Sequence, residues 1–215
     1  MRGLLLIALA VSAPAFATTA TFRYEAFVGA VRAGEAVVEI RTTKEGYEVR
    51  GRAKSKGLWE AISRWRARFS VAGIFGKKAP EPQRYYLFQK DDEKKREVTV
   101  QDGMLQYTKN GRQRPRRPAF PGADVLTALF IDGECRATVT IHTGRHGYEL
   151  KRLGEAQESC RYHVVDEDGD EFDAEIRFAE RHGLIVPVSI DVNGTVRGHM
   201  RLVDSYTVAA IGDLD

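Results

Sequence analysis

The sequence predicts an all-β, mainly antiparallel protein in which a single curved sheet of about 12–13 strands closes into a barrel or half-barrel, with two short helices. Two observations predict this fold. Apolar and charged residues alternate with a period of two along most of the chain from Phe22 onward, and Gly-containing pairs typical of hairpin turns separate the alternating runs. A meander of this length is expected to curl, with its apolar face inside.

The composition is that of a globular protein. The 215 residues include 33 Lys or Arg, 30 Asp or Glu and 43% hydrophobic residues, which excludes an intrinsically disordered chain. The formal net charge of +3 is too small to indicate a nucleic-acid partner. We expect one domain over residues 18–215.

Residues 1–17 are typical of a secretory signal peptide. Arg2 precedes the apolar run from Leu4 to Val11, and the small residues Ala15 and Ala17 suit cleavage after Ala17. The apolar run is too short to span a bilayer, and no Cys stands at the cleavage point to carry a lipid. We therefore expect a soluble periplasmic protein that is not a lipoprotein. A buried N-terminal helix is the alternative.

The strands are predicted wherever one face of the chain is apolar and the other charged. At the first strand, for example, Phe22 and Tyr24 alternate with Arg23 and Glu25. The clearest such segments are residues 22–28, 36–41, 47–53, 65–71, 137–141, 172–178 and 196–202. A membrane β-barrel shares this period, but these charged faces would then have to line its lumen, and the C-terminal end lacks an aromatic girdle. We favour the soluble fold.

Two segments break the alternation and are predicted to be short helices. The first is 57–63, and the second is 122–131, with Asp124 as its N-cap or first-turn acid. The expected hairpin turns include the pairs Asp102–Gly103, Asn110–Gly111 and His182–Gly183, which supply the positive φ that tight turns require.

Cys135 and Cys160 are candidates for a disulfide, because an exported chain meets an oxidising compartment. If both turns between them are simple hairpins, the two residues lie on strands separated by a third strand and cannot be bonded. The bond requires Cys135 to lie in the loop entering its strand, or the sheet to fold back. Two buried free thiols are the alternative.

No metal site is predicted. His142 and His146 have a spacing that binds zinc on a helix, with His163 or Asp166 as a third ligand, but here they flank a Gly-rich turn between strands. We expect exposed histidines of a turn and a strand instead.

The acidic run 166–171 resembles a calcium loop at first sight. It departs from the EF-hand because Gly169 is the fourth position and Arg177 occupies the twelfth, where a bidentate Glu belongs. We expect a charged hairpin tip and no cofactor.

Four arginines, Arg112, Arg114, Arg116 and Arg117, lie in an extended Pro-containing stretch before the second helix. They are candidates for contact with an anionic membrane surface. A solvated connector is the alternative.

No motif for a nucleophilic serine or cysteine, for a phosphate-binding loop or for a redox Cys pair is present. The sequence therefore favours a non-enzymatic protein. A hydrolase assembled from scattered His and Asp residues remains an alternative.

Several segments together resemble the exported bacterial family known as domain of unknown function 3108. They are 22–29 with 33–36, 53–57, 124–130 and 186–190. Two positions depart from that family: Thr127 stands where Ser is usual, and Ile131–Asp132 replaces an expected Arg. The resemblance implies an envelope protein with a curved β-sheet or barrel and no assigned activity.

We expect a periplasmic module that binds a lipid-like or other apolar small molecule in a barrel cavity. Inward-facing aromatic residues would line it, and the candidates are Trp59, Trp65, Phe69 and Tyr85. The alternative is a structural or adaptor protein of the envelope with a filled core and an arginine-rich contact surface. No nucleic-acid partner is expected, and the sequence names no protein partner.

Overall fold

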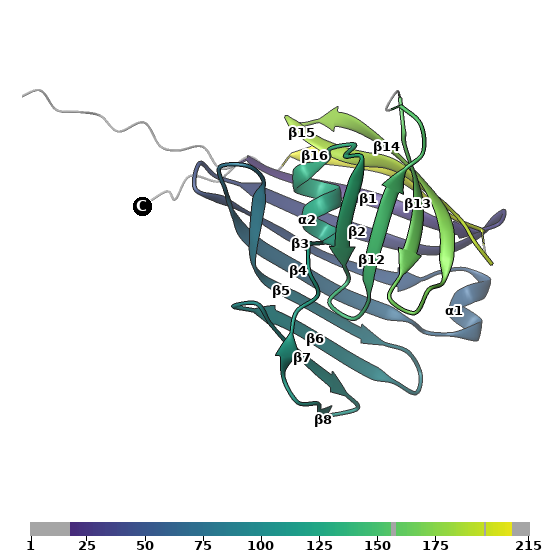
Figure 1. Ribbon diagram of the computed structural model, residues 1–215. Coiled ribbons are helices and arrows are strands. Elements are labelled where there is room, and N and C mark those ends of the chain that lie inside the picture. Colours follow the sequence, from purple (N-terminus) through teal and green to yellow (C-terminus); the bar gives the residue numbers. More distant parts are fainter. Residues whose placement is uncertain (1–17, 156–157, 196, 208–215) are drawn as a thin grey trace, which may run out of the picture.

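A computed structural model describes residues 18–155, 158–195 and 197–207 (Figure 1). The predicted signal peptide and its cleavage position after Ala17 lie outside the described residues.

The described residues form one sheet of 16 strands. The strands are β1 (Thr18–Val28), β2 (Val31–Thr42), β3 (Gly46–Ser55), β4 (Arg66–Phe75), β5 (Pro80–Lys90), β6 (Lys95–Gln101), β7 (Met104–Lys109), β8 (Arg112–Gln113), β9 (Arg117–Pro118), β10 (Ala123–Asp124), β11 (Thr138–His142), β12 (Gly147–Arg152), β13 (Cys160–Asp166), β14 (Glu171–Arg181), β15 (Leu184–Asn193) and β16 (Arg197–Thr207). Because β8, β9 and β10 contain only two residues each, the longer strands match the count expected from the sequence.

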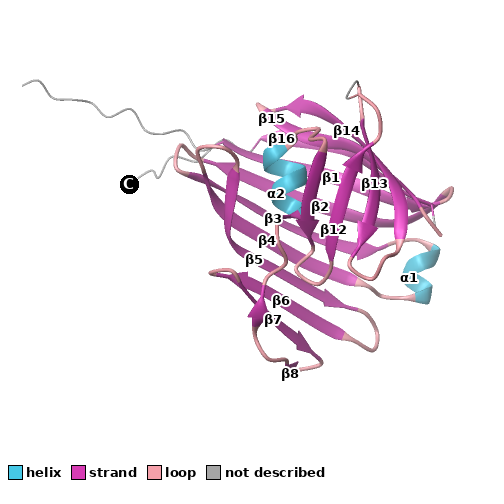
Figure 2. Cartoon of the chain, in the orientation of Figure 1, coloured by secondary structure: helices cyan, strands magenta, loops and turns pink. Residues whose placement is uncertain are grey.

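The sheet is open, so the fold is a half-barrel and not a closed barrel. Its order is β10-β11-β12-β13-β14-β15-β16-β1-β2-β3-β4-β5-β6-β7-β8, with β9 also paired to β7. The pairing of β16 with β1 joins the two ends of the described chain in the middle of the sheet. All pairs are antiparallel except β10 with β11. Strands β12 and β13 cross in front of the long strands β1 to β5, so the sheet curls over itself (Figure 2).

The alternating pattern places the apolar residues on the inner face of this curl. Phe22 on β1 lies opposite Val38 on β2, and Val49 on β3 lies opposite Val71 on β4; all four are buried. The intervening charged residues, such as Arg23, occupy the outer face. Burying each large apolar side chain contributes about 1.5–3 kcal/mol, so the alternation fixes the register of the sheet.

The expected hairpin turns are confirmed where the backbone requires positive φ. Asp102, Asn110 and His182 have φ of 51°, 50° and 54°, and the Gly that follows each of them also has positive φ. Two successive residues of this kind form the turn that matches the right-handed twist of the flanking strands.

Both predicted helices are present and short. The first is α1 (Leu58–Ile62), and the second is α2 (Val125–Thr127), which continues as one π-helical turn, η1 (Ala128–Asp132). Asp124 is the N-cap of α2, as predicted, and accepts hydrogen bonds from the backbone N–H groups of Leu126 and Thr127. Among the described helices, none has the length and apolar character needed to cross a bilayer.

The second helix fills the interior of the half-barrel. Leu126 and Phe130 join the main hydrophobic cluster with Tyr24, Tyr47 and Val71 of the sheet. The curl therefore holds a side-chain core around α2 and η1, which leaves only limited space for a ligand.

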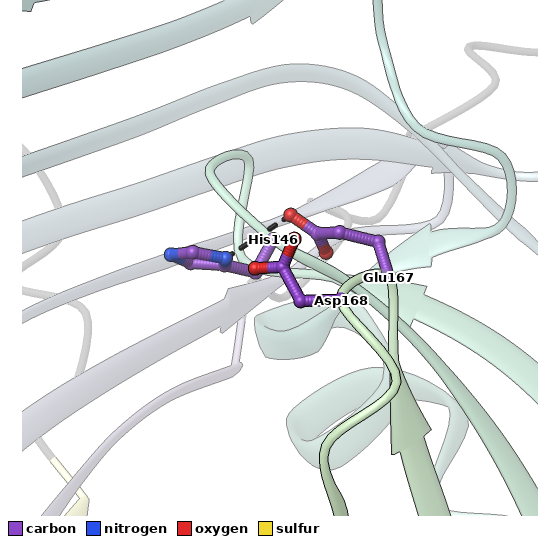
Figure 3. A group of neighbouring side chains, drawn as sticks. All are labelled: His146, Glu167 and Asp168. Atoms are coloured by element: carbon purple, nitrogen blue, oxygen red, sulfur yellow. Dashed lines mark hydrogen bonds and ion pairs between the residues drawn. The ribbon is translucent and has the colours of Figure 1, made fainter.

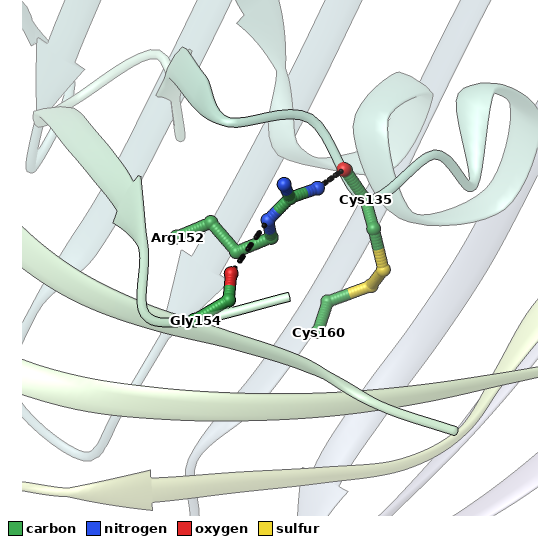
Figure 4. The surroundings of a disulfide bond; sticks show 4 residues. All are labelled: Cys135, Arg152, Gly154 and Cys160. Carbon is green, nitrogen blue, oxygen red and sulfur yellow. Dashed lines mark hydrogen bonds between the residues drawn. A yellow bond between two sulfur atoms is a disulfide. The ribbon is translucent and has the colours of Figure 1, made fainter. Parts of the chain in front are cut away.

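Cys135 and Cys160 form a disulfide, with a distance of 5.5 Å between their Cα atoms (Figure 4). Cys160 begins β13, whereas Cys135 lies in the loop that enters β11, which is one of the two arrangements that permit the bond. Arg152 on β12 donates a hydrogen bond of 2.6 Å to the carbonyl oxygen of Cys135 and so holds this loop against the sheet.

Candidate functional site

A cavity of about 300 Å³ remains on the inner face, between strands β4 and β5 and the turn that joins β11 to β12. Residues from four parts of the chain line it: Phe69, Tyr85, Leu87, Gln89, Val125, Leu126, Thr143, Arg145, His146 and Tyr148. The half-barrel thus brings Phe69 and Tyr85, two of the four aromatic residues predicted for a ligand site, to one cavity.

The cavity combines apolar walls with a polar side. Leu87 and Leu126 are buried, whereas Arg145 is exposed and His146 is half-buried in the β11–β12 turn. Such a cavity can hold an apolar group of a ligand and place an acidic group of the same ligand beside Arg145.

Tyr85 also has a structural role. Its hydroxyl donates a hydrogen bond of 2.9 Å to the carbonyl oxygen of Thr143 and so connects β5 to the β11–β12 turn. Burial raises the pKa of Tyr85, so the phenol stays neutral and remains a donor.

Phe69 is positioned by Gly51, its cross-strand partner on β3. A Cβ at position 51 would overlap the Phe69 ring, so Gly51 gives the ring room to lie across the neighbouring strand. In the sequence, a glycine at an inward-facing position of a predicted strand is the signal for such a close approach.

The two tryptophans lie elsewhere. Trp59 is on α1 and is 37% exposed, so the expectation that it faces the interior is wrong. Trp65 is half-buried just before β4, where its carbonyl oxygen accepts a hydrogen bond from the backbone N–H of Ser55, and it is outside both hydrophobic clusters. A period of two cannot assign a face to residues in or beside the helix that interrupts the strands.

A second cavity, of about 160 Å³, is lined in part by Asp124, His142 and Tyr85. Asp124 is completely buried, and desolvation raises the pKa of its carboxyl even though three hydrogen-bond donors contact it. Desolvation lowers the pKa of His142, whose Nδ1 accepts a hydrogen bond from the backbone N–H of Gly144. Among the residues that line this cavity, none carries a serine or threonine hydroxyl or a cysteine thiol that could act as a nucleophile.

His146, Glu167 and Asp168 lie close enough together to consider a metal ion (Figure 3). His142, the partner suggested by sequence spacing, is not in this group. Nδ1 of His146 lies 3.1 Å from Oε1 of Glu167, and Oε2 of Glu167 accepts a hydrogen bond from the backbone N–H of Gly147. The Glu167 carboxylate already contacts His146 and the backbone N–H of Gly147, and both Glu167 and Asp168 are exposed. We therefore assign no metal ion to the group.

The other proposed third ligands are also engaged. His163 pairs with Glu171 and Asp173 on the sheet surface. Oδ1 of Asp166 accepts hydrogen bonds from the backbone N–H groups of Asp168 and Asp170, both at 2.9 Å. The acidic run is therefore a hairpin tip between β13 and β14, as expected.

The four arginines predicted to contact an anionic surface are exposed at the β7 edge of the sheet. Arg112 belongs to β8 and Arg117 to β9, while Arg114 and Arg116 lie between them. The guanidinium of Arg117 stacks 4.9 Å from the centre of the Phe120 ring. The segment is solvated.

Sequence reasoning missed a second group of cations on the outer face of β3, β4 and β5. An open groove of about 1010 Å³ runs over these strands and is lined by Arg50, Arg52, Arg68 and Arg84, among others. The alternation of apolar and basic residues in 47–53 and 65–71 contained part of the signal, but only cross-strand pairing shows that Arg52 lies opposite Arg68.

Comparison with known proteins gives one family. The family described as "Protein of unknown function (DUF3108)" matches residues 23–159. Among solved structures, the chain resembles a β-barrel-like protein of domain of unknown function DUF1849 from Brucella abortus, with 9% sequence identity and a TM-score of 0.43 over 90% of this chain and 98% of that one. No curated protein matches the sequence.

Proposed function

Because this chain belongs to the DUF3108 family, whose description names no activity, we propose its function from its geometry: an exported, non-enzymatic envelope module that binds a small amphipathic ligand beside Phe69 and Tyr85. The observation that carries the proposal is the cavity of about 300 Å³ with buried apolar walls and a basic residue, Arg145, at its exposed side.

The size of the cavity restricts the ligand. Small-molecule sites usually occupy about 300–1,000 Å³, so this one is at the lower limit. The helix α2 and the turn η1 occupy the space that a large lipid would need. We therefore propose a single short acyl chain or a similar apolar group, joined to an acidic head that pairs with Arg145.

Two observations support export. The first 17 residues have the pattern of a signal peptide, and a disulfide joins the two cysteines of the chain. N-terminal sequencing of the protein isolated from its own cells tests this directly. A mature chain that starts at Thr18 is expected, and a chain that retains residues 1–17 in the cytoplasm would contradict export.

The binding experiment uses decanoate as the probe, in competition with the fluorescent anionic dye 1-anilinonaphthalene-8-sulfonate. Val125→Phe places a ring in the cavity, and Arg145→Ala removes the cation; each is expected to weaken decanoate binding roughly tenfold, the equivalent of about 1.4 kcal/mol. Arg112→Ala removes an exposed arginine outside the cavity and is the matched control. Decanoate affinity that is equal in all four proteins, or undetectable in the unmodified one, would refute the site.

An adaptor protein of the envelope is the second candidate, and the filled core favours it. Native mass spectrometry of protein purified from its own periplasm separates the two functions. A co-purified ligand that is lost in Val125→Phe supports the binding module, whereas a mass equal to that of the polypeptide alone supports the adaptor.

A further inference from the structure

Helix α1 exposes its apolar side chains to solvent. Leu58 is 71% exposed and Ile62 is 72% exposed, and Trp59 beside them is 37% exposed. None of the five residues of this helix is buried. Leu58 and Ile62 are four residues apart and Trp59 and Ile62 are three apart, so the three side chains lie on one face of α1. The helix itself projects from the end of the sheet (Figure 1).

The strands that lead into and out of α1 carry facing cations. Lys54 at the end of β3 lies directly opposite Arg66 at the start of β4, and Arg66 lies opposite Lys90 on β5. One step further from the helix, Arg52 lies opposite Arg68. Like charges in directly opposed positions destabilise a sheet, so folding alone gives no reason for this arrangement.

Most of these cations lack an acidic partner. Within the described ranges, Arg52, Arg64, Arg66 and Arg68 form no ion pair, whereas Lys54 and Lys56 share Glu35. Besides Glu35, the acids nearby are Glu60 on α1 itself and Asp92, which accepts a hydrogen bond from the backbone N–H of Arg64. A groove of about 420 Å³ runs over the outer face here. Its polar lining contains four cations and one acid: Arg52, Lys54, Arg66, Arg68 and Glu35.

We propose that α1 and these outer-face cations form a docking surface for an anionic lipid bilayer. Leu58, Trp59 and Ile62 would enter the boundary between headgroups and acyl chains, and Arg64, Arg66 and Arg68 would contact the lipid phosphates. Tryptophan is enriched at the boundary between a membrane and water. Trp59 therefore suits this boundary, as do the exposed aliphatic side chains beside it and the arginines around them.

A bilayer suits this surface better than a protein partner does. The apolar patch consists of three side chains on a projecting turn, which can enter a fluid interface but offer little area to a folded protein. The four arginines of the segment 112–117 are at the β7 edge of the sheet and have no exposed apolar helix beside them. Comparing membrane binding by the two surfaces therefore tests whether arginines alone are sufficient.

The experiment measures binding of the full mature chain to vesicles that contain phosphatidylglycerol and to vesicles of phosphatidylcholine alone. Binding to the anionic vesicles only is expected, with a blue shift of tryptophan fluorescence that Trp59→Phe abolishes. Leu58→Ser/Ile62→Ser should weaken binding at least roughly tenfold at every salt concentration. Arg66→Gln/Arg68→Gln should weaken it mainly at low salt and reduce its salt dependence.

Arg112→Gln/Arg114→Gln is the matched control and should bind like the unmodified protein. All the substituted side chains are exposed, so thermal unfolding should be unchanged in the α1 and control variants. It should be unchanged or shifted to higher temperature in Arg66→Gln/Arg68→Gln, because that variant relieves the repulsion from the cations opposite. Unchanged decanoate binding separates this surface from the cavity. No binding by the unmodified protein, equal binding by the α1 variant, or loss of binding in the control alone would overturn the proposal.

Discussion

The hydroxyl of Tyr47 on β3 lies 3.1 Å from the hydroxyl of Thr127 on α2, across 80 residues of sequence. The Thr127 hydroxyl donates a hydrogen bond of 2.6 Å to Oδ2 of Asp124, so its oxygen accepts the hydrogen bond from the Tyr47 hydroxyl. All three residues are buried. This chain of hydrogen bonds attaches the interior helix to the sheet and satisfies the carboxylate that caps the helix.

Thr127→Val keeps the shape of the side chain but leaves the Tyr47 hydroxyl and one Asp124 oxygen without a partner. Because unsatisfied buried polar groups are costly, we expect a loss of about 2 kcal/mol in the free energy of unfolding, measured by urea titration. Thr138→Val, on the exposed start of β11, is the control and should change stability by less than about 0.5 kcal/mol. Equal effects of the two substitutions would exclude the proposed network.

The stability of the protein should fall as the pH drops below about 6.5. Folding lowers the pKa of His142 from 6.5, chiefly through desolvation, so at acid pH the unfolded chain binds a proton that the folded chain does not. His142→Asn keeps an acceptor for the N–H of Gly144 and removes the titration. Urea titrations at about pH 7.5 and about pH 5.5 should show a smaller loss in the variant than in the unmodified protein. Parallel losses would contradict the role of His142.

Removal of the disulfide should destabilise the protein by about 3 kcal/mol, since the bond closes a loop between residues 25 apart and restricts the unfolded chain. Cys135→Ala/Cys160→Ala and the reduced unmodified protein should have the same lowered urea midpoint. A midpoint that does not respond to reductant would show that the two thiols are free.

Tyr24 and Tyr85 should respond differently to the same substitution. The Tyr24 hydroxyl is buried next to the Phe130 ring and has no hydrogen-bond partner in the part of the chain that the structure describes, so Tyr24→Phe should leave stability unchanged or increase it. Tyr85→Phe removes the bond to the Thr143 carbonyl oxygen and should cost about 1 kcal/mol. Thermal unfolding of both variants tests this, and a cost at Tyr24 equal to that at Tyr85 would reveal a partner for its hydroxyl.

The local structure could be predicted from the sequence because its causes are local. Alternation between residues such as Phe22 and Arg23 assigns the two faces of a strand, Asn110–Gly111 specifies a turn, and Asp124 caps a helix through N–H groups two and three residues away. The family resemblance was confirmed by the match over residues 23–159.

The candidate site was predictable only in part. Phe69 is in the alternating segment 65–71, so its inward direction followed from the pattern. Tyr85 is in the apolar run 85–88, which does not alternate, and its direction is set by its pairing with the buried Val71 on β4. Trp59 is on the short helix between strands, where that pattern gives no direction, and Arg145 joins the cavity only because the β11–β12 turn folds over β5.

The sequence by itself determined which residues face inward along the alternating strands, where the chain turns and where the helices begin, since these depend on neighbours a few residues away. Only the tertiary structure decided that β16 pairs with β1, that the sheet stays open, that Cys135 reaches Cys160 and that the core is filled by α2. These features depend on how the twist of many strands accumulates, and a pattern with a period of two is the same for a flat, curled or closed sheet.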